Sequence, residues 1–216
     1  MDMSRVGLLG GSFNPAHGGH RAISLFARRA LGLDEVWWLV SPGNPLKLQA
    51  GMAPFHARMA SAIEQARRAP IKPTGIEREL GTRYTVDTLR GIVDRYPAHD
   101  FIWLMGADNL AQFDRWKDWR EIARIMPIAV IARPGYDNAA MASPAMAWLQ
   151  RFVHDATDAK DWTDWRPPAL VPLRFRPDPR SATLLRQSDP HWHRRYAGRV
   201  LRDPVTHAPI HAEDSP

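Results

Sequence analysis

The sequence predicts an α/β fold in which a doubly wound parallel sheet is covered by helices on both faces. Short apolar runs alternate with amphipathic stretches along the chain, and turn-forming residues separate them. Such alternation is typical of parallel strands joined by right-handed helical crossovers. With 216 residues, 44% of them hydrophobic, the chain is long enough to bury the core of a single domain.

The individual elements follow in chain order from their periodicity. A short apolar run ends at Gly10 and Gly11, and after Asn14 and Pro15 apolar residues recur at helical spacing up to Leu31. This unit of buried strand, loop and helix then repeats. Strands are expected at residues 6–9, 35–40, 71–74, 101–105 and 128–131, and helices at about 18–31, 54–66, 85–96 and 110–125.

The remainder of the chain has a weaker pattern. Residues 135–168 are poorly periodic and rich in proline, tryptophan and aspartate, so an irregular excursion is expected there. We place a single domain with a short C-terminal helical subregion at residues 1–189. Residues 190–216 form a basic C-terminal segment, and from residue 203 onward it offers little to bury, so a frayed tail is expected.

Composition restricts the class of function. The net charge of +6 and the pI near 10.1 favour anionic partners. Residues 171–202 contain eight arginines and two aspartates, which suits the phosphates of a nucleotide or a nucleic acid. The absence of cysteine excludes disulfides, thiolate metal sites and a cysteine nucleophile. No run is long enough for a signal peptide or a membrane span, so a cytoplasmic protein without a membrane partner is expected.

Three unusual loops are expected to meet at one edge of the sheet. In open parallel sheets, ligands bind in the crevice beyond the carboxyl ends of the strands. The loops at residues 10–17, 41–47 and 106–109 would all emerge there.

The strongest motif is GGSFNPAHGGH at residues 10–20, between the first strand and the first helix. Its first two glycines allow a tight turn and a close ligand approach, and a helix beginning near Gly18 directs N–H groups and its positive dipole end at the crevice. His17 and His20 project to the same side and can donate hydrogen bonds to neighbouring phosphate oxygens. Zinc is the alternative for paired histidines, but no third ligand lies at a suitable spacing, so no metal ligand is predicted.

This string resembles the signature of the nucleotidylyl transferase superfamily, whose paired-histidine motif is written here as His17-Gly18-Gly19-His20. A second motif of that superfamily, Ser-x-Thr-x-x-Arg, is matched by Ser181-Ala182-Thr183-Leu184-Leu185-Arg186. Ser181 can also cap a short helix, and the start of that helix can hold a polyphosphate. The resemblance implies a Rossmann-like fold and transfer of a nucleotidyl group from a nucleoside triphosphate.

Within the superfamily, residues 84–89, 106–109, 115–117 and 132–135 resemble the nicotinate-nucleotide adenylyltransferase branch. This resemblance implies that ATP and nicotinate mononucleotide are the substrates, and that nicotinate adenine dinucleotide and pyrophosphate are the products, in a step of NAD biosynthesis. It also implies that Mg²⁺ arrives bound to ATP and that the protein has no nucleic-acid partner. A homo-oligomer is compatible with it.

The resemblance also assigns the site residues. Catalysis is assigned to His17, His20 and Arg186. ATP binding is assigned to Gly10, Gly11, Ser12, Phe13, His17, His20, Gly106, Asp108, Ser181, Thr183 and Arg186. Mononucleotide binding is assigned to Asn14, Lys47, Thr85, Trp116, Lys117 and Arg133, with Trp116 against the pyridine ring. The sequence departs from the pattern at Asn14, where aspartate is frequent, at Arg180, where an apolar residue is common, and after Asp189, where it does not align.

Three other readings are open. The chain could be a nucleotidylyl transferase for nicotinamide mononucleotide or phosphopantetheine, or a non-catalytic nucleotide sensor on the same fold. It could also bind nucleic acid through a platform of Trp192, Arg194, Arg195 and Tyr196. Tryptophans 37, 38 and 103 lie in predicted buried strands and are expected in the core. The intact histidine pair favours the enzyme.

Overall fold

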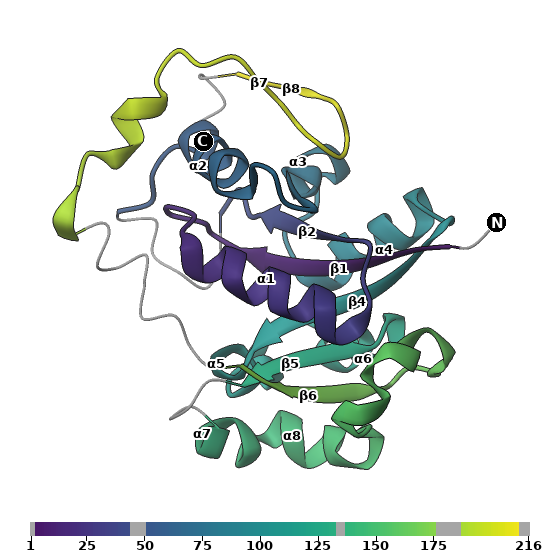
Figure 1. Cartoon of the computed structure of the whole chain (residues 1–216). Helices are drawn as coiled ribbons and strands as arrows, with labels where there is room; N and C mark the ends of the chain where they lie inside the picture. The colour runs from purple at the N-terminus through teal and green to yellow at the C-terminus, as the bar shows by residue number, and fades with distance from the viewer. Residues whose placement is uncertain (1–2, 44–50, 133–136, 176–186, 212–216) are drawn as a thin grey trace.

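A computed structural model describes residues 3–43, 51–132, 137–175 and 187–211, with the side chains of residues 137 and 138 left aside (Figure 1). Its main sheet has six strands in the order β3-β2-β1-β4-β5-β6, and every pairing is parallel. The strands are β1 (Ser4–Gly11), β2 (Glu35–Val40), β3 (Ile71–Thr74), β4 (His99–Gly106), β5 (Ile128–Ala132) and β6 (Leu170–Arg174). This is the doubly wound order, and it reverses between β1 and β4, which confirms the predicted Rossmann-like α/β fold.

Helices cover both faces of this sheet because side chains alternate along each strand. On one face, α1 (Gly18–Leu31) and α2 (Phe55–Ala66) pack against Trp38, Ile102 and Leu104. On the other face, α4 (Thr85–Arg95) and α6 (Trp119–Ile125) pack against Trp37 and Trp103 (Figure 1). The predicted burial of these three tryptophans is therefore confirmed.

The stretch predicted as one helix at residues 110–125 is broken, and the prediction was wrong there. It begins at the last residue of α5 (Ala107–Leu110) and then contains the 3-10 turn η1 (Phe113–Arg115) and α6. Asp118 has a φ of 48°, in the left-handed region that a right-handed helix excludes. Trp116, two residues earlier, is extended, with φ −78° and ψ 143°, and its ring lies across the ring of Trp103 rather than along a helix surface.

Residues 135–168 are more regular than expected. The structure has α7 (Asp137–Met141), α8 (Pro144–Leu149), η2 (Gln150–Phe152) and η3 (Ala156–Asp164) there, followed by the unpredicted strand β6. Ser143 caps α8, because its Oγ accepts from the backbone N–H of Met146 at 3.1 Å. In η3, Trp162 is buried and its Nε1 donates to the carbonyl of Leu31 at 3.0 Å. A 3-10 helix lacks the 3.6-residue period, so the apolar pattern did not reveal it.

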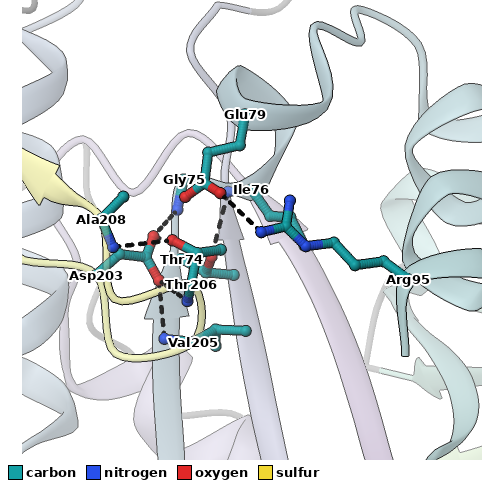
Figure 2. Close-up of polar contacts among 9 residues, drawn as sticks. All are labelled: Thr74, Gly75, Ile76, Glu79, Arg95, Asp203, Val205, Thr206 and Ala208. Atoms are coloured by element: carbon teal, nitrogen blue, oxygen red, sulfur yellow. Dashed lines mark hydrogen bonds and ion pairs between the residues drawn. The ribbon is translucent and has the colours of Figure 1, made fainter. Parts of the chain in front are cut away.

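The expected fraying from residue 203 was also wrong within the described part of the chain, which extends to residue 211. The 3-10 turn η4 (Trp192–Tyr196) packs on α2, and β7 (Leu201–Arg202) pairs with β8 (Pro209–Ile210). Both aromatic rings of η4 are buried, so they cannot form the stacking platform of the nucleic-acid reading. Asp203 is 2% exposed and joins the β7–β8 turn to the end of β3 (Figure 2).

Candidate active site

A pocket of about 480 Å³ lies at the carboxyl ends of β1, β2 and β4, next to the point where the strand order reverses. Its volume suits a nucleotide-sized ligand, and its position is where open α/β sheets bind ligands. The loops after these strands meet there as predicted. The lining residues are Gly10, Gly11, Ser12, His20, Ser41, Glu77, Arg83, Tyr84, Thr85, Trp103, Asp108, Asn109, Arg115, Trp116 and Lys117.

His17 and His20 form a capping box at the start of α1. The Nδ1 atom of His17 accepts from the backbone N–H of Gly19 at 3.1 Å, and the Nδ1 atom of His20 accepts from that of His17 at 3.2 Å. A neutral imidazole that accepts at Nδ1 carries its hydrogen on Nε2, so each ring presents Nε2–H as its donor. The ring centroids lie 3.9 Å apart.

The same capping box changes one expectation about α1. The sequence predicted that the first N–H groups of this helix would be unpaired and would point at an anion. Instead the N–H of Gly19 is taken by His17, and the N–H groups of His20 and Arg21 reach the carbonyl of His17 at 3.0 and 3.4 Å. The two imidazoles therefore occupy the helix start. Of the pair, His20 lines the pocket, while His17 is 8% exposed beside it.

Phe13 and Asn14 lie behind the pocket lining. Phe13, with a φ of 47° and 1% exposure, stacks on Trp38 with centroids 5.0 Å apart and contacts His20 at 4.8 Å. Its ring therefore supports His20 from behind. The side chain of Asn14 donates to the carbonyl of Gly51 at 2.9 Å and accepts from the N–H of Ala53 at 3.2 Å. It fastens the segment before α2 and is not among the lining residues.

The start of α4 and the segment after η1 form one wall of the pocket. This wall includes three of the residues that the resemblance assigned to the mononucleotide: Thr85, Trp116 and Lys117. The Nζ atom of Lys117 lies 3.1 Å from Asp87 Oδ2 and 4.7 Å from the ring centre of Tyr84. The ammonium group of Lys117 thus contacts residues at the start of α4. The backbone N–H of Lys117 is then the part suited to a ligand.

The loop after β4 brings Asp108 and Asn109 to the pocket. Gly106 is not itself a lining residue, but a Cβ placed on it would collide with Oδ1 of Asp108. A larger residue at this position would therefore have to displace the Asp108 carboxylate, which folds back over Gly106. Asp108 lies in the short first turn of α5, where a negative side chain is favoured.

Arg58, on α2, was missed by the sequence analysis although it joins the pocket loops. It is 1% exposed and donates to the carbonyls of Ser12, Ser41, Pro42 and Ala53 at 2.8, 2.6, 3.0 and 3.0 Å. Burial lowers its pKa to about 10, so it remains charged at neutral pH. A charged residue among the apolar and small residues of this helix was the available signal.

Trp103 and Glu77 were missed for different reasons. Trp103 was assigned to the core, where it is 3% exposed, yet it also lines the pocket. Within the described ranges its buried Nε1 has no hydrogen-bond partner. Glu77 lies on α3 (Ile76–Leu80), a five-residue helix that was not predicted, because a single turn has too few residues to show a period.

Five assigned residues lie outside the described part of the chain: Lys47, Arg133, Ser181, Thr183 and Arg186. Among the residues that the structure describes, no group of three or more histidine, aspartate or glutamate side chains could hold a metal ion. None of the described helices combines the length and apolar character needed to cross a bilayer.

Comparison with known proteins decides the family. The cytidylyltransferase-like family model matches residues 8–188. A protein of Erythrobacter litoralis named "probable nicotinate-nucleotide adenylyltransferase" is 65% identical over 212 residues, covering 98% of this chain and 97% of the relative. The chain belongs to the nicotinate-nucleotide adenylyltransferase family. A relative with the same name from Parvibaculum lavamentivorans is 52% identical over 183 residues, covering 85% of this chain and 91% of its own length.

A solved structure of this kind has the same fold. The nicotinic acid mononucleotide adenylyltransferase of Plasmodium falciparum, complexed with NaAD, matches with a TM-score of 0.58 at 14% identity and covers 85% of this chain and 83% of that one. The cytidylyltransferase-like family model ends at residue 188, so η4, β7 and β8 lie beyond the part that this model matches. The Erythrobacter relative spans nearly the whole chain, including most of this additional segment.

Proposed function

We propose that this pocket transfers the adenylyl group of ATP to nicotinate mononucleotide, giving nicotinate adenine dinucleotide and pyrophosphate. The observation that carries the proposal is the His17–His20 capping box, because backbone N–H groups hold both Nδ1 atoms and thereby fix Nε2–H as the donor of each ring. Two preorganised donors beside a nucleotide-sized pocket suit a reaction in which negative charge builds on phosphate oxygens.

In the proposed reaction, a phosphate oxygen of the mononucleotide attacks the α-phosphorus of ATP in line with the leaving group. The new bond joins that oxygen to the α-phosphorus, and the bond from the α-phosphorus to the bridging oxygen breaks as pyrophosphate leaves. The attacking phosphate is ionised near neutral pH, so no general base is needed. The protein contributes positioning and stabilisation of charge, for which we assign His17 and His20.

ATP is proposed to lie along the Gly10-Gly11-Ser12 turn, with Asp108 at its ribose. Asp108 is suited to this role because a carboxylate accepts hydrogen bonds from ribose hydroxyls. Ser181, Thr183 and Arg186 are proposed to hold the polyphosphate, as the resemblance implies. Mg²⁺ is proposed to arrive bound to ATP, since it keeps few protein ligands when phosphates are present, and it would neutralise part of the polyphosphate charge.

The mononucleotide is proposed to lie against Trp116, with its carboxylate at the backbone N–H groups near Thr85 and Lys117. Among the described residues, no side chain caps the start of α4, an 11-residue helix, so the N–H groups of Thr85 and Val86 are suited to an anion. An amide in place of the carboxylate would turn an N–H₂ group toward those donors and leave a buried donor unpaired, at a cost of about 1–3 kcal/mol. Nicotinate mononucleotide should therefore be used about 5- to 150-fold better than the amide.

The test is pyrophosphate release from Mg-ATP with nicotinate mononucleotide, nicotinamide mononucleotide and phosphopantetheine in parallel. We expect the highest kcat/KM with the nicotinate compound. Equal efficiency with the acid and the amide would contradict the selectivity claim, and release with phosphopantetheine alone would contradict the substrate. Absence of release with all three, from protein that binds ATP, would favour the nucleotide-sensor reading instead.

A further inference from the structure

The charges that line the pocket are of both signs. Arg83, Arg115 and Lys117 provide positive charge, and Glu77 and Asp108 provide carboxylates. The proposed substrates are strongly anionic, and a carboxylate repels an anion at short range. A carboxylate in such a pocket is suited to the hydroxyl groups of a ribose, which are the uncharged donors that nucleotides offer.

Glu77 is held in place from the side of the C-terminal segment. Oδ2 of Asp203 accepts from the N–H of Gly75 at 2.7 Å and from Oγ1 of Thr74 at 3.0 Å, directly before α3 (Figure 2). Thr74 Oγ1 in turn accepts from the N–H of Ile76 at 3.2 Å. The other oxygen of Asp203 accepts from backbone N–H groups of the β7–β8 turn, at Val205 and Thr206.

The other end of α3 is fixed as well. The carbonyl of Glu77 accepts from the N–H of Thr82 at 3.0 Å, and Gly81 ends the helix in the left-handed conformation, with a φ of 64°. The backbone on both sides of Glu77 is therefore hydrogen-bonded. The point from which the Glu77 side chain reaches the pocket is thereby fixed.

The surroundings of the Glu77 carboxyl favour a ligand role over a purely structural one. Burial raises its pKa to about 7, while a hydrogen bond from Ser41 and the charge of Arg58 oppose that shift. Among the described residues, the Arg58 guanidinium makes its hydrogen bonds with four backbone carbonyls, so it is already satisfied. Glu77 is thus more than a counter-ion to Arg58, and it retains acceptor capacity toward the pocket that it lines.

We propose that Glu77 binds the ribose of the mononucleotide by accepting a hydrogen bond from one of its hydroxyl groups. This assignment rests on the proposed function. Two carboxylates line the pocket and the two substrates bring two riboses, of which the one in ATP is proposed to meet Asp108. Glu77 lines the pocket together with Tyr84, Thr85 and Trp116, the wall proposed for the mononucleotide.

A consequence is selectivity for a hydroxyl-bearing sugar on the mononucleotide. At about pH 8, above the pKa of about 7 that burial gives Glu77, its carboxylate is ionised, and a hydrogen bond to such a charged acceptor contributes about 10- to 100-fold to kcat/KM. Either the 2′-deoxy or the 3′-deoxy form of nicotinate mononucleotide should lose that factor with the wild-type protein. The C-terminal segment contributes indirectly, because Asp203 is a positioning residue for α3.

The experiment is a double-mutant cycle between protein and substrate. Pyrophosphate release is measured for wild type, Glu77→Ala and Glu77→Gln with nicotinate mononucleotide, its 2′-deoxy and 3′-deoxy forms, and with ATP and 2′-deoxy-ATP. We expect one deoxy mononucleotide to lose about 10- to 100-fold with wild type but less than about threefold with Glu77→Ala. If Glu77→Ala does not fold, Glu77→Gln, which preserves the size of the side chain, carries the same comparison.

The matched control is Glu79→Ala. Glu79 lies on the same short helix, but its carboxylate pairs with Arg95 at 3.2 Å (Figure 2), and it is not among the residues that line the pocket. This variant should show the full deoxy penalty of the wild-type protein. If the deoxy mononucleotides lose as much activity with both Glu77 variants as with wild type, the assignment is overturned. If instead the loss with 2′-deoxy-ATP is smaller in the Glu77 variants than in wild type, Glu77 binds the ribose of ATP. A wild-type protein with no release from the ordinary substrates contradicts the proposed function itself, which is a distinguishable result.

Discussion

The indole of Trp103 on β4 fills the space that a side chain on Gly10 of β1 would need. A Cβ built on Gly10 would lie 2.7 Å from Cη2 of Trp103, closer than real Cβ contacts. The sequence assigned Gly10 to close approach of a ligand. The structure adds that a glycine here leaves room for the indole of Trp103, which also lines the pocket. The same indole lies 6.4 Å, centroid to centroid, from Trp116.

Gly10→Ala should therefore overpack this contact. We expect a loss of about 1–3 kcal/mol in the free energy of unfolding, measured by urea denaturation, together with a lower kcat/KM. Trp103→Leu should relieve much of the loss in the double variant, because it removes the ring that the new methyl group meets. Additive losses in the double variant would show that the two residues do not interact.

His20→Ala should lower turnover by about 100- to 1,000-fold, the scale expected for a preorganised donor to a developing charge. The capping box adds a stability cost of about 0.5–2 kcal/mol, because the N–H of His17 loses its acceptor. His20→Gln separates the two effects, since glutamine is a usual capping-box residue at this position. It should recover most of the melting temperature but little of the turnover. Recovery of more than half of the wild-type turnover would contradict the catalytic role.

Arg58→Ala should cost about 3–5 kcal/mol of folding stability, because four buried or half-buried carbonyls lose their donor at once. The comparison is Arg29→Ala, an exposed arginine on α1, which should change stability by less than about 0.5 kcal/mol. Chemical denaturation of both variants measures the difference. If the Arg58 variant is as stable as the Arg29 variant, the hydrogen bonds of Arg58 to the loop carbonyls do not stabilise the fold.

The stability of the protein should depend on pH through Glu77. Its pKa is raised by burial from 4.5 to about 7, so the folded state binds a proton more tightly than the unfolded state. Its contribution is fully present below about pH 4.5 and is lost as the pH rises toward 7 and above. The charged and titratable groups that face it are Arg58 on α2 and, around the pocket, His20, Arg83, Tyr84, Asp108, Arg115 and Lys117.

We measure this contribution as the difference between wild type and Glu77→Gln. Lowering the pH from about 8 to about 5 should stabilise wild type relative to the variant by at most about 3 kcal/mol, and partial exposure of Glu77 reduces that figure. Urea denaturation across this range gives the two curves, and titrations shared by both proteins cancel. Parallel curves would show that the pKa of Glu77 is not raised.

Trp116→Ala should raise the KM for the nicotinate and nicotinamide mononucleotides alike, with little change in melting temperature, because an indole can stack on either ring. Trp119→Ala is the comparison. Trp119 packs on Trp148, with ring centroids 5.3 Å apart, and does not line the pocket. It should destabilise the fold and leave the KM values unchanged. A large stability loss in Trp116→Ala with an unchanged KM would make Trp116 a core residue.

The sequence by itself determined the sheet and the place of the site. Five strands, the helices α1, α2 and α4, and the convergence of three loops all follow from hydrophobic period and turn residues, which are local properties. The histidine pair could be recognised because the capping box that the two rings form depends on three-residue spacing at a helix start. Only the resemblance assigned a common binding site to Thr85, Trp116 and Lys117. In the structure all three line the same pocket.

Only the tertiary structure decided which side chains support these residues. Phe13 and Asn14 belong to the ligand motif in sequence, yet their side chains support His20 and the segment before α2. Arg58 donates hydrogen bonds to carbonyls, and Asp203 accepts them from N–H groups, of residues far away in the sequence. No local sequence pattern predicts such partners. The left-handed Asp118 breaks a stretch whose composition favours a helix, because Trp116 and Trp119 on its two sides both pack on the buried ring of Phe113, and such tertiary packing outweighs the helix propensity of a few residues.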